Sequence, residues 1–137
     1  MSPVRSETFR ISTRGRRVSD LTERVRAFAR QAAGDGLLNV FIPHATAGVA
    51  LMETGSGSES DLELLIERLL PRDDRYAHRH GSAGHGGDHL FPVLVSASLT
   101  LPVVDGEVQL GIWQSIVLVD PNVDNDERTV RLSFVEG

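Results

Sequence analysis

A histidine- and glycine-rich segment in the middle of the chain limits what the rest can fold into. Residues 76–89 read YAHRHGSAGHGGDH and hold four of the five histidines of this 137-residue protein. No aliphatic side chain larger than alanine occurs there, so the segment cannot build a hydrophobic core, and we predict a surface loop. His85 and His89 stand four residues apart and would share a helix face, but the glycines argue against a helix. The core must come from the flanking segments.

The flanking segments predict one α+β domain over residues 1–137, with a sandwich-like β-sheet core and two main helices. Helical spacing of apolar residues predicts helices over 20–33 and 60–70. Alternating or continuous apolar runs predict strands over 8–13, 37–42, 49–52, 99–104, 108–112, 115–119 and 130–134. The run 37–42 is nearly continuous, which indicates a central strand buried on both faces. Asp105-Gly106 predicts a tight hairpin turn, and Pro102 predicts an edge or a bulge.

Composition and charge exclude several classes of protein. Hydrophobic residues make up 40% and charged residues 24%, and the net charge of -5 argues against a nucleic-acid partner. The absence of cysteine excludes disulfides and thiolate metal sites. No apolar run approaches the roughly 20 residues of a membrane span, and residues 1–10 lack the apolar core of a signal peptide. We expect a cytoplasmic protein with no membrane partner.

His44 is the one histidine outside the loop, and it lies in Pro43-His44-Ala45-Thr46-Ala47-Gly48 between two apolar runs. An imidazole placed between buried strands needs a polar partner. It either hydrogen-bonds the backbone in a structural role or meets the histidine loop. We expect the second, with His44, His78 and His89 converging on one site.

Two chemistries are open to such a site. Three neutral imidazoles form the ligand set of a catalytic divalent metal, zinc first, with one position left for water or substrate. Without a metal, the same cluster would bind phosphate and move protons. Spacing alone does not decide between them, and no organic cofactor is expected.

Other candidate residues each have a structural and a functional interpretation. Arg14-Gly15-Arg16-Arg17 is either a solvated hairpin tip or a lip that binds an anion, since arginine pairs well with phosphate oxygens. Trp113 packs in a core or interface, or stacks on a flat ring. Gln114 hydrogen-bonds that ring or the backbone. Glu53 orients a histidine, acts as a base, or forms a salt bridge.

The order of several short motifs resembles the YjbQ-like family, small proteins described as secondary thiamine-phosphate synthases. The match runs from about Phe9 to Gly137. The matching pieces are His44-Ala45-Thr46-Ala47-Gly48 with Glu53, Asp61-Leu62, Leu70-Pro71 with Asp73 and Asp74, Tyr76-Ala77-His78, His89, Ser98-Leu99-Thr100-Leu101-Pro102-Val103 and Gly111-Ile112-Trp113-Gln114. The chain departs from the family pattern at 84–88, where relatives carry an asparagine. His78 and His80 compete for one family position, and the Tyr-Ala-His context favours His78.

The resemblance implies a fold, an assembly and an activity. It implies an α+β homotrimer with sites near subunit boundaries, and a metal among the histidines in some relatives. The implied reaction joins hydroxymethylpyrimidine diphosphate to thiazole phosphate and releases pyrophosphate. The implied catalytic residues are His44, Glu53, His78 and His89, with His44, His78 and His89 as metal ligands. The candidate substrate-binding residues are Trp113, Gln114, Thr46, Arg16 and Arg17.

Three functions remain open at this point. The first is that transferase, with histidine and arginine stabilising the leaving group and Trp113 stacking the base. The second is a metal-dependent hydrolase of a small phosphorylated metabolite. The third is a protein that binds a small anionic metabolite without turning it over.

Overall fold

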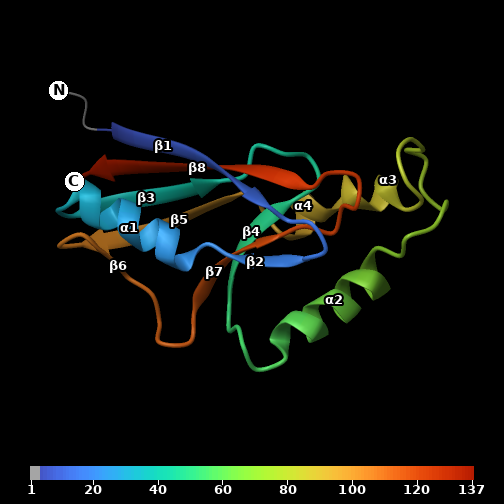
Figure 1. Ribbon diagram of the computed structural model, residues 1–137, viewed down its shortest axis with the longest axis horizontal. Helices are drawn as coiled ribbons and strands as arrows, with labels where there is room; N and C mark the ends of the chain where they lie inside the picture. Colours follow the sequence, from blue (N-terminus) through green and yellow to red (C-terminus); the bar gives the residue numbers. More distant parts are fainter. Residues whose placement is uncertain (1–3) are drawn as a thin grey trace.

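Two antiparallel sheets are stacked in the computed structural model, which describes residues 4–137 (Figure 1). The five-stranded sheet has the order β1-β8-β3-β5-β6, and the three-stranded sheet has the order β2-β7-β4. The strands are β1 (Val4–Ser12), β2 (Val18–Asp20), β3 (Gly36–Phe41), β4 (Gly48–Met52), β5 (Ser98–Val104), β6 (Glu107–Val108), β7 (Ser115–Val119) and β8 (Glu127–Glu136). The helices are α1 (Thr22–Ala32), α2 (Ser58–Leu69) and the single turns α3 (His85–Asp88) and α4 (Phe91–Leu94). The predicted α+β fold is confirmed. Residues 1–3 of the predicted domain span lie outside the described residues.

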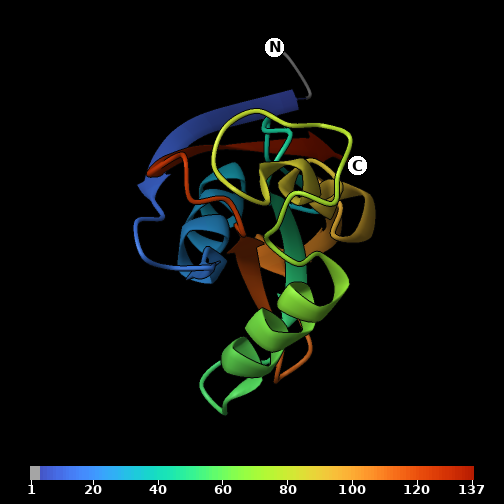
Figure 2. The same ribbon diagram turned by 90° about the vertical axis from the view of Figure 1, so that its right-hand side faces the viewer.

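The main core lies on one face of the five-stranded sheet, beneath α1 and the three-stranded sheet (Figures 1 and 2). Val25 and Phe28 of α1 meet Leu38 of β3 and Leu118 of β7 in one apolar cluster. Full burial of each such side chain contributes about 1.5–3 kcal/mol. This cluster therefore holds the two sheets and α1 together as one unit.

The strand buried on both faces is β7. Its residues Ile116 and Leu118 belong to the main core, whereas Val117 and Val119 pack in a second cluster with Ile66. These four side chains are fully buried because the sheet that contains β7 has apolar neighbours above and below it.

The prediction for β3 is half right. The strand is central, between β8 and β5. Its residues Leu38 and Val40 are buried, but Leu37 is 53% and Phe41 40% exposed on the other face. An apolar run therefore marks two different situations: a strand covered on both faces, and a strand whose outer face is open in the isolated chain.

Helix α2 projects from the two sheets (Figure 2). It begins two residues earlier than predicted, after Gly57 in the left-handed conformation at φ 93°. Only Ile66 is buried, and Leu65 and Leu69 lie largely exposed on the same helix. Across residues 4–137, no helix combines the length and apolar character that crossing a membrane requires.

The hairpin between β5 and β6 is confirmed, because Asp105 and Gly106 both have positive φ, at 50° and 74°. On one side, β5 is bordered by the two-residue β6, and the backbone of Pro102 faces that side, where its carbonyl accepts from Gln109 N. This position is close to the edge of the sheet, as predicted. The predicted strand 108–112 is wrong beyond Val108. Ile112 and Trp113 instead sit exposed in the loop before β7.

A buried ion pair joins the ends of several elements. The side chains of Arg128 and Asp120 are 2% and 1% exposed. Arg128 Nε donates to Asp120 Oδ2 at 2.6 Å and its second nitrogen donates to Oδ1 at 2.9 Å. The hydroxyl of Thr46 accepts from Arg128 at 2.8 Å, and that of Thr13 donates to Asp120 at 3.2 Å. The pair thereby connects the chain after β1, the loop before β4, the end of β7 and the start of β8.

Replacing one partner of this pair should be costly. Arg128→Met leaves the Asp120 carboxylate buried without a counter-charge, so the free energy of unfolding should fall by about 3–5 kcal/mol. The matched control is Arg14→Met, which breaks only an exposed, solvent-screened pair with Asp126 and should leave the free energy of unfolding nearly unchanged. Urea denaturation of both variants measures the difference. Similar losses for the two variants would contradict a structural role for the buried pair.

Candidate functional site

The four histidines of the loop gather into one group. One ring nitrogen from each lies within 4.8 Å of the corresponding nitrogen of every other member. The members are His78, His80, His85 and His89. Both His78 and His80 belong to the group, and the assignment of His78 to the family position stays a prediction. We call this group the histidine cluster.

The prediction against a helix in this segment is wrong, because 85–88 form the helical turn α3. The turn brings the Nε2 atoms of His85 and His89 to 2.9 Å. The glycines serve close packing. A Cβ on Gly86 would lie 2.5 Å from the carbonyl oxygen of His78, and one on Gly87 would lie 2.7 Å from the hydroxyl of Tyr76. Larger residues would push the turn away from the rest of the loop.

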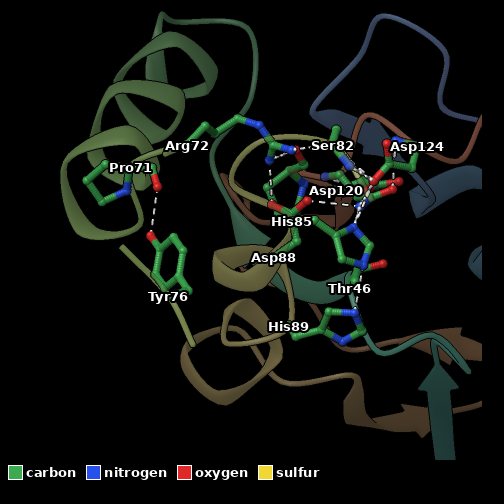
Figure 3. A network of polar contacts seen from close by, with 12 residues as sticks. Thr46, Pro71, Arg72, Tyr76, Ser82, His85, Asp88, His89, Asp120 and Asp124 are labelled. Atoms are coloured by element: carbon green, nitrogen blue, oxygen red, sulfur yellow. Dashed lines mark hydrogen bonds and ion pairs between the residues drawn. The ribbon is translucent and has the colours of Figure 1, made fainter. Parts of the chain in front are cut away.

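His85 is the most enclosed member of the cluster, with a side chain that is 9% exposed. Its Nδ1 lies 2.8 Å from Asp124 Oδ2 (Figure 3). An ionised carboxylate only accepts hydrogen bonds, so Nδ1 must carry the hydrogen. The lone pair then resides on Nε2, the atom that faces His89.

A second layer of polar residues supports the cluster. Arg72 donates to Asp88 Oδ1 at 2.5 Å, to the carbonyl of Pro121 at 3.1 Å and to Ser82 Oγ at 3.1 Å (Figure 3). Asn122 Nδ2 donates to the other oxygen of Asp88 at 2.9 Å. These bonds join the histidine loop to the loop 120–126.

Sequence reasoning missed these supporting residues. In the sequence, residues 121–127 (PNVDNDE) predict only a polar loop. The signal available was a dense run of Asn and Asp that directly follows an apolar strand. Nothing in the sequence indicated which of these side chains would face the histidines.

The electrostatics of His89 favour a neutral imidazole. Burial lowers its pKa below the ordinary value of 6.5, and the neighbouring His85, His78 and His80 lower it further. A neutral ring retains a lone pair, which is the form that binds metals. His89 is therefore suited to coordinate a metal ion through a neutral ring, and not to act as a positively charged imidazolium.

His44 does not join the cluster within one chain. Its Nε2 accepts the backbone N–H of Thr129 at 2.9 Å. Pairing between β3 and β8 ends at Phe41 and Arg131, so beyond that point the His44 ring replaces the missing strand partner. Burial, followed by the charge of Arg128, lowers the pKa of His44 and keeps it neutral. Within a single chain, His44 therefore has the structural role, in which it hydrogen-bonds the backbone. The meeting of His44 with the histidine cluster of a neighbouring chain stays a prediction.

Two other predicted residues, Glu53 and Gln114, lie at the end of β7 that is far from the histidine cluster. Register pairs Met52 with Ser115 and Gly48 with Val119, so these two residues lie beyond one end of β7, and Asp120, which leads into the loop 120–126, lies beyond the other. A five-residue strand spans about 15 Å. Gln114 Oε1 accepts the N–H of Gly111 at 2.8 Å within its own turn.

Trp113 and Thr46 differ sharply in exposure. Trp113 is 72% exposed, and the loop before β7 that carries it lies away from α3 (Figure 1). Thr46 is buried, and its hydroxyl accepts a hydrogen bond from Arg128. Among residues 4–137, no hydrogen bond joins either side chain to the histidine cluster.

The basic hairpin borders a cavity of about 350 Å³. Arg14 is committed to an ion pair with Asp126, and Arg16 donates to the carbonyl of Ser12. The half-buried Arg17 has no side-chain partner within residues 4–137. The cavity is lined by residues 13–17, by Glu63 and by the loop residues 120–123, 125 and 126. We call it the arginine cavity.

The histidine cluster fits a divalent metal in its donor set. Zinc takes imidazole nitrogens at about 2.1 Å, which puts tetrahedral ligand atoms about 3.4 Å apart, inside the span observed here. A carboxylate on the far nitrogen of a histidine is the usual partner of such ligands, and Asp124 occupies that position on His85.

Comparisons with known proteins agree on one family. Residues 7–137 match the family model described as UPF0047 protein YjbQ-like. A UPF0047 protein of Mycobacterium bovis is 63% identical over 127 residues, covering 93% of this chain and 98% of that protein. A hypothetical protein of Aeropyrum pernix K1 has a solved structure with a TM-score of 0.86 at 31% identity, covering 97% of this chain and 99% of the other. A YbjQ-like protein of unknown function from Sulfolobus solfataricus P2 shares the fold, with a TM-score of 0.89 at 22% identity and 98% coverage of both chains.

Proposed function

This chain belongs to the UPF0047 YjbQ-like family, and we propose that it is a hydrolase of a small phosphorylated substrate. In this proposal the histidine cluster holds the divalent metal ion that the reaction uses. The observation that supports this proposal is the grouping of four ring nitrogens within 4.8 Å of one another. Four imidazoles with no cysteine suit zinc best among common metals, although copper and nickel also accept such ligands.

The cluster has an inner and an outer half. His85 is buried and His89 half-buried, whereas His78 and His80 are exposed. The inner pair would hold the ion, and the exposed pair would complete the site and exchange with water or substrate. A divalent ion held there would supply Lewis-acid activation of water and of a phosphoryl oxygen. Whichever of His78 and His80 is not bound to the ion would accept the proton released by the attacking water.

The arginine cavity supports a phosphorylated substrate. Among residues 4–137, the half-buried Arg17 has no side-chain partner and the Arg16 side chain donates to a backbone carbonyl alone. Asn122 lines this cavity and also donates to Asp88 beneath the cluster, so the two sites border the same loop. Arg16 and Arg17 would hold a phosphate group of the substrate bidentately.

Metal content and variant affinities test the proposed metal site. The purified protein should contain about one zinc per chain by elemental analysis, and a strong chelator should abolish hydrolysis of a panel of phosphomonoesters and pyrophosphate esters. His85→Ala and His89→Ala should weaken zinc binding at least about 100-fold, and His78→Ala and His80→Ala less. His44→Ala distinguishes the two roles of His44. An unchanged zinc affinity would mean that His44 is structural, and a lower zinc affinity would mean that His44 reaches the metal site of a neighbouring chain. A metal-free protein that also fails to bind added zinc would refute the proposal.

A double substitution tests phosphate binding in the arginine cavity. Arg16→Ala with Arg17→Ala should weaken binding of inorganic phosphate at least about 10-fold by calorimetric titration, because charge-assisted bonds are lost. The free energy of unfolding should change by less than about 0.5 kcal/mol, because neither arginine side chain forms an ion pair within residues 4–137. The matched control replaces Arg26 and Arg30 on α1, which form exposed ion pairs of 3.3 and 3.4 Å. Equal phosphate affinity in the two double variants would show that the basic hairpin 14–17 is a solvated tip that does not bind phosphate.

The transferase implied by the family resemblance is the second candidate. The observation that favours it is the exposed ring of Trp113, which is free to stack on a pyrimidine. Trp113 and Gln114 lie at the end of β7 away from the cluster, so this reaction needs them to come from a neighbouring chain. The discriminating assay is formation of thiamine phosphate from hydroxymethylpyrimidine diphosphate and thiazole phosphate.

We also propose a homotrimer, which would bring the two halves of the predicted site together between chains. Exposed apolar side chains support this, because soluble monomers rarely leave large apolar surfaces open. Those at least half exposed are Leu37, Leu64, Leu65, Leu69, Val93, Leu94, Ile112, Trp113 and Val123.

Light scattering at micromolar concentration tests the assembly. It should report about three times the chain mass of 14.9 kDa, because burial of these apolar side chains between chains favours association. A monomer at that concentration would contradict both the trimer and the transferase that depends on it.

A further inference from the structure

His85 is the only member of the cluster that, within residues 4–137, has a carboxylate hydrogen-bonded to its ring. Nδ1 lies 2.8 Å from Asp124 Oδ2 and 3.2 Å from Asn122 Nδ2, and Nε2 faces His89. The Asn122 amide makes a shorter bond, of 2.9 Å, to the buried carboxylate of Asp88, which Arg72 also holds. The closer and charged Asp124 is therefore the group that can place the hydrogen of His85 on Nδ1.

Asp124 is itself held firmly. Its Oδ2 accepts from Ser82 N at 3.4 Å, from Ser82 Oγ at 3.1 Å and from His85 Nδ1 at 2.8 Å. Its own backbone N–H donates to Asn122 Oδ1 at 2.9 Å. An ordinary aspartate carboxylate is ionised near neutral pH and only accepts hydrogen bonds.

We propose that Asp124 is the positioning residue of the histidine cluster, fixing His85 in its Nδ1–H tautomer so that the Nε2 lone pair is presented to a divalent cation. Metal-bound histidines commonly hold such a carboxylate on the second nitrogen, and its loss typically lowers metal affinity 10–100-fold. This inference rests on the proposed metal site and adds to it a residue 35 positions beyond His89 in sequence.

The geometry gives Asp124 a role beyond joining two loops. Ser82 already links the histidine loop to Arg72, and Asn122 links the two loops through Asp88. The contact between Asp124 and His85 adds an orienting bond to a ring that is already buried. A residue that only joined the loops would affect stability, whereas a positioning residue changes the proton on His85.

Two readouts separate these roles. In metal-free protein labelled with 15N-histidine, long-range proton–nitrogen correlation spectra should assign the hydrogen of His85 to Nδ1. Asp124→Ala should lose that preference, and Asp124→Asn, which keeps one acceptor oxygen, should recover part of it. Titration with Co²⁺, followed by its visible absorption in competition with a chelator, should show affinity lowered 10–100-fold in Asp124→Ala.

The matched control is Asp126→Ala, which removes a carboxylate two residues away in the same loop. Asp126 pairs with Arg14 and makes no contact with a histidine among the described residues. This variant should keep the wild-type tautomer and Co²⁺ affinity. Circular dichroism confirms that each variant remains folded, and Asp124→Asn serves as the test if Asp124→Ala unfolds.

The outcomes distinguish this inference from the proposed function. Equal Co²⁺ affinity in the Asp124 and Asp126 variants, with a wild type that binds, overturns the role of Asp124 and leaves the metal site standing. A wild type that binds no Co²⁺ refutes the proposed function and the metal-presenting role together. An Nε2–H tautomer of His85 in metal-free wild type overturns the inference whatever the metal result.

Discussion

A buried charge must have a partner, and the ion pair between Arg128 and Asp120 meets this requirement where four segments end. Asp120 directly follows β7, the strand that is buried on both faces, and Arg128 lies at the start of β8. Because both residues are held in place, the loop between them starts and ends at fixed points. That loop carries Asn122 and Asp124, and so the position of the histidine cluster depends on a pair that contacts no histidine of the cluster directly.

The cluster itself combines close packing with polar satisfaction. Gly86 and Gly87 let the α3 turn approach Tyr76, and this approach sets His85 and His89 on one face. Arg72 and Asp88 then fill the space beneath with charge-assisted hydrogen bonds. The result is asymmetric, with an enclosed inner pair of histidines and an exposed outer pair. Such asymmetry would suit the proposed metal site, in which the inner pair holds the ion and the outer pair exchanges with water or substrate.

The position of the predicted residues Glu53 and Gln114, at the end of β7 far from the histidine cluster, bears on assembly. Glu53 and Gln114 lie beyond one end of the strand, and Asp120, which leads into the loop that supports the cluster, lies beyond the other. A rigid strand cannot bring its own ends together, so no side-chain rearrangement within one chain would unite them. The exposed Leu37 and Phe41 on the outer face of the five-stranded sheet are further apolar surface that association would cover.

The sequence by itself determined the α+β class, most of the strands, the two longer helices and the segment in which the histidines gather. These features are local, because apolar periodicity and turn residues such as Asp105-Gly106 act over a few positions. Sequence also singled out His78 and His89. Only the tertiary structure decided that His80 and His85 join them, that α3 forms despite its glycines, and that His44 bonds Thr129 in one chain. It alone brought Asp124 to His85, because that contact depends on how two distant loops pack, and no local pattern encodes the distance between them.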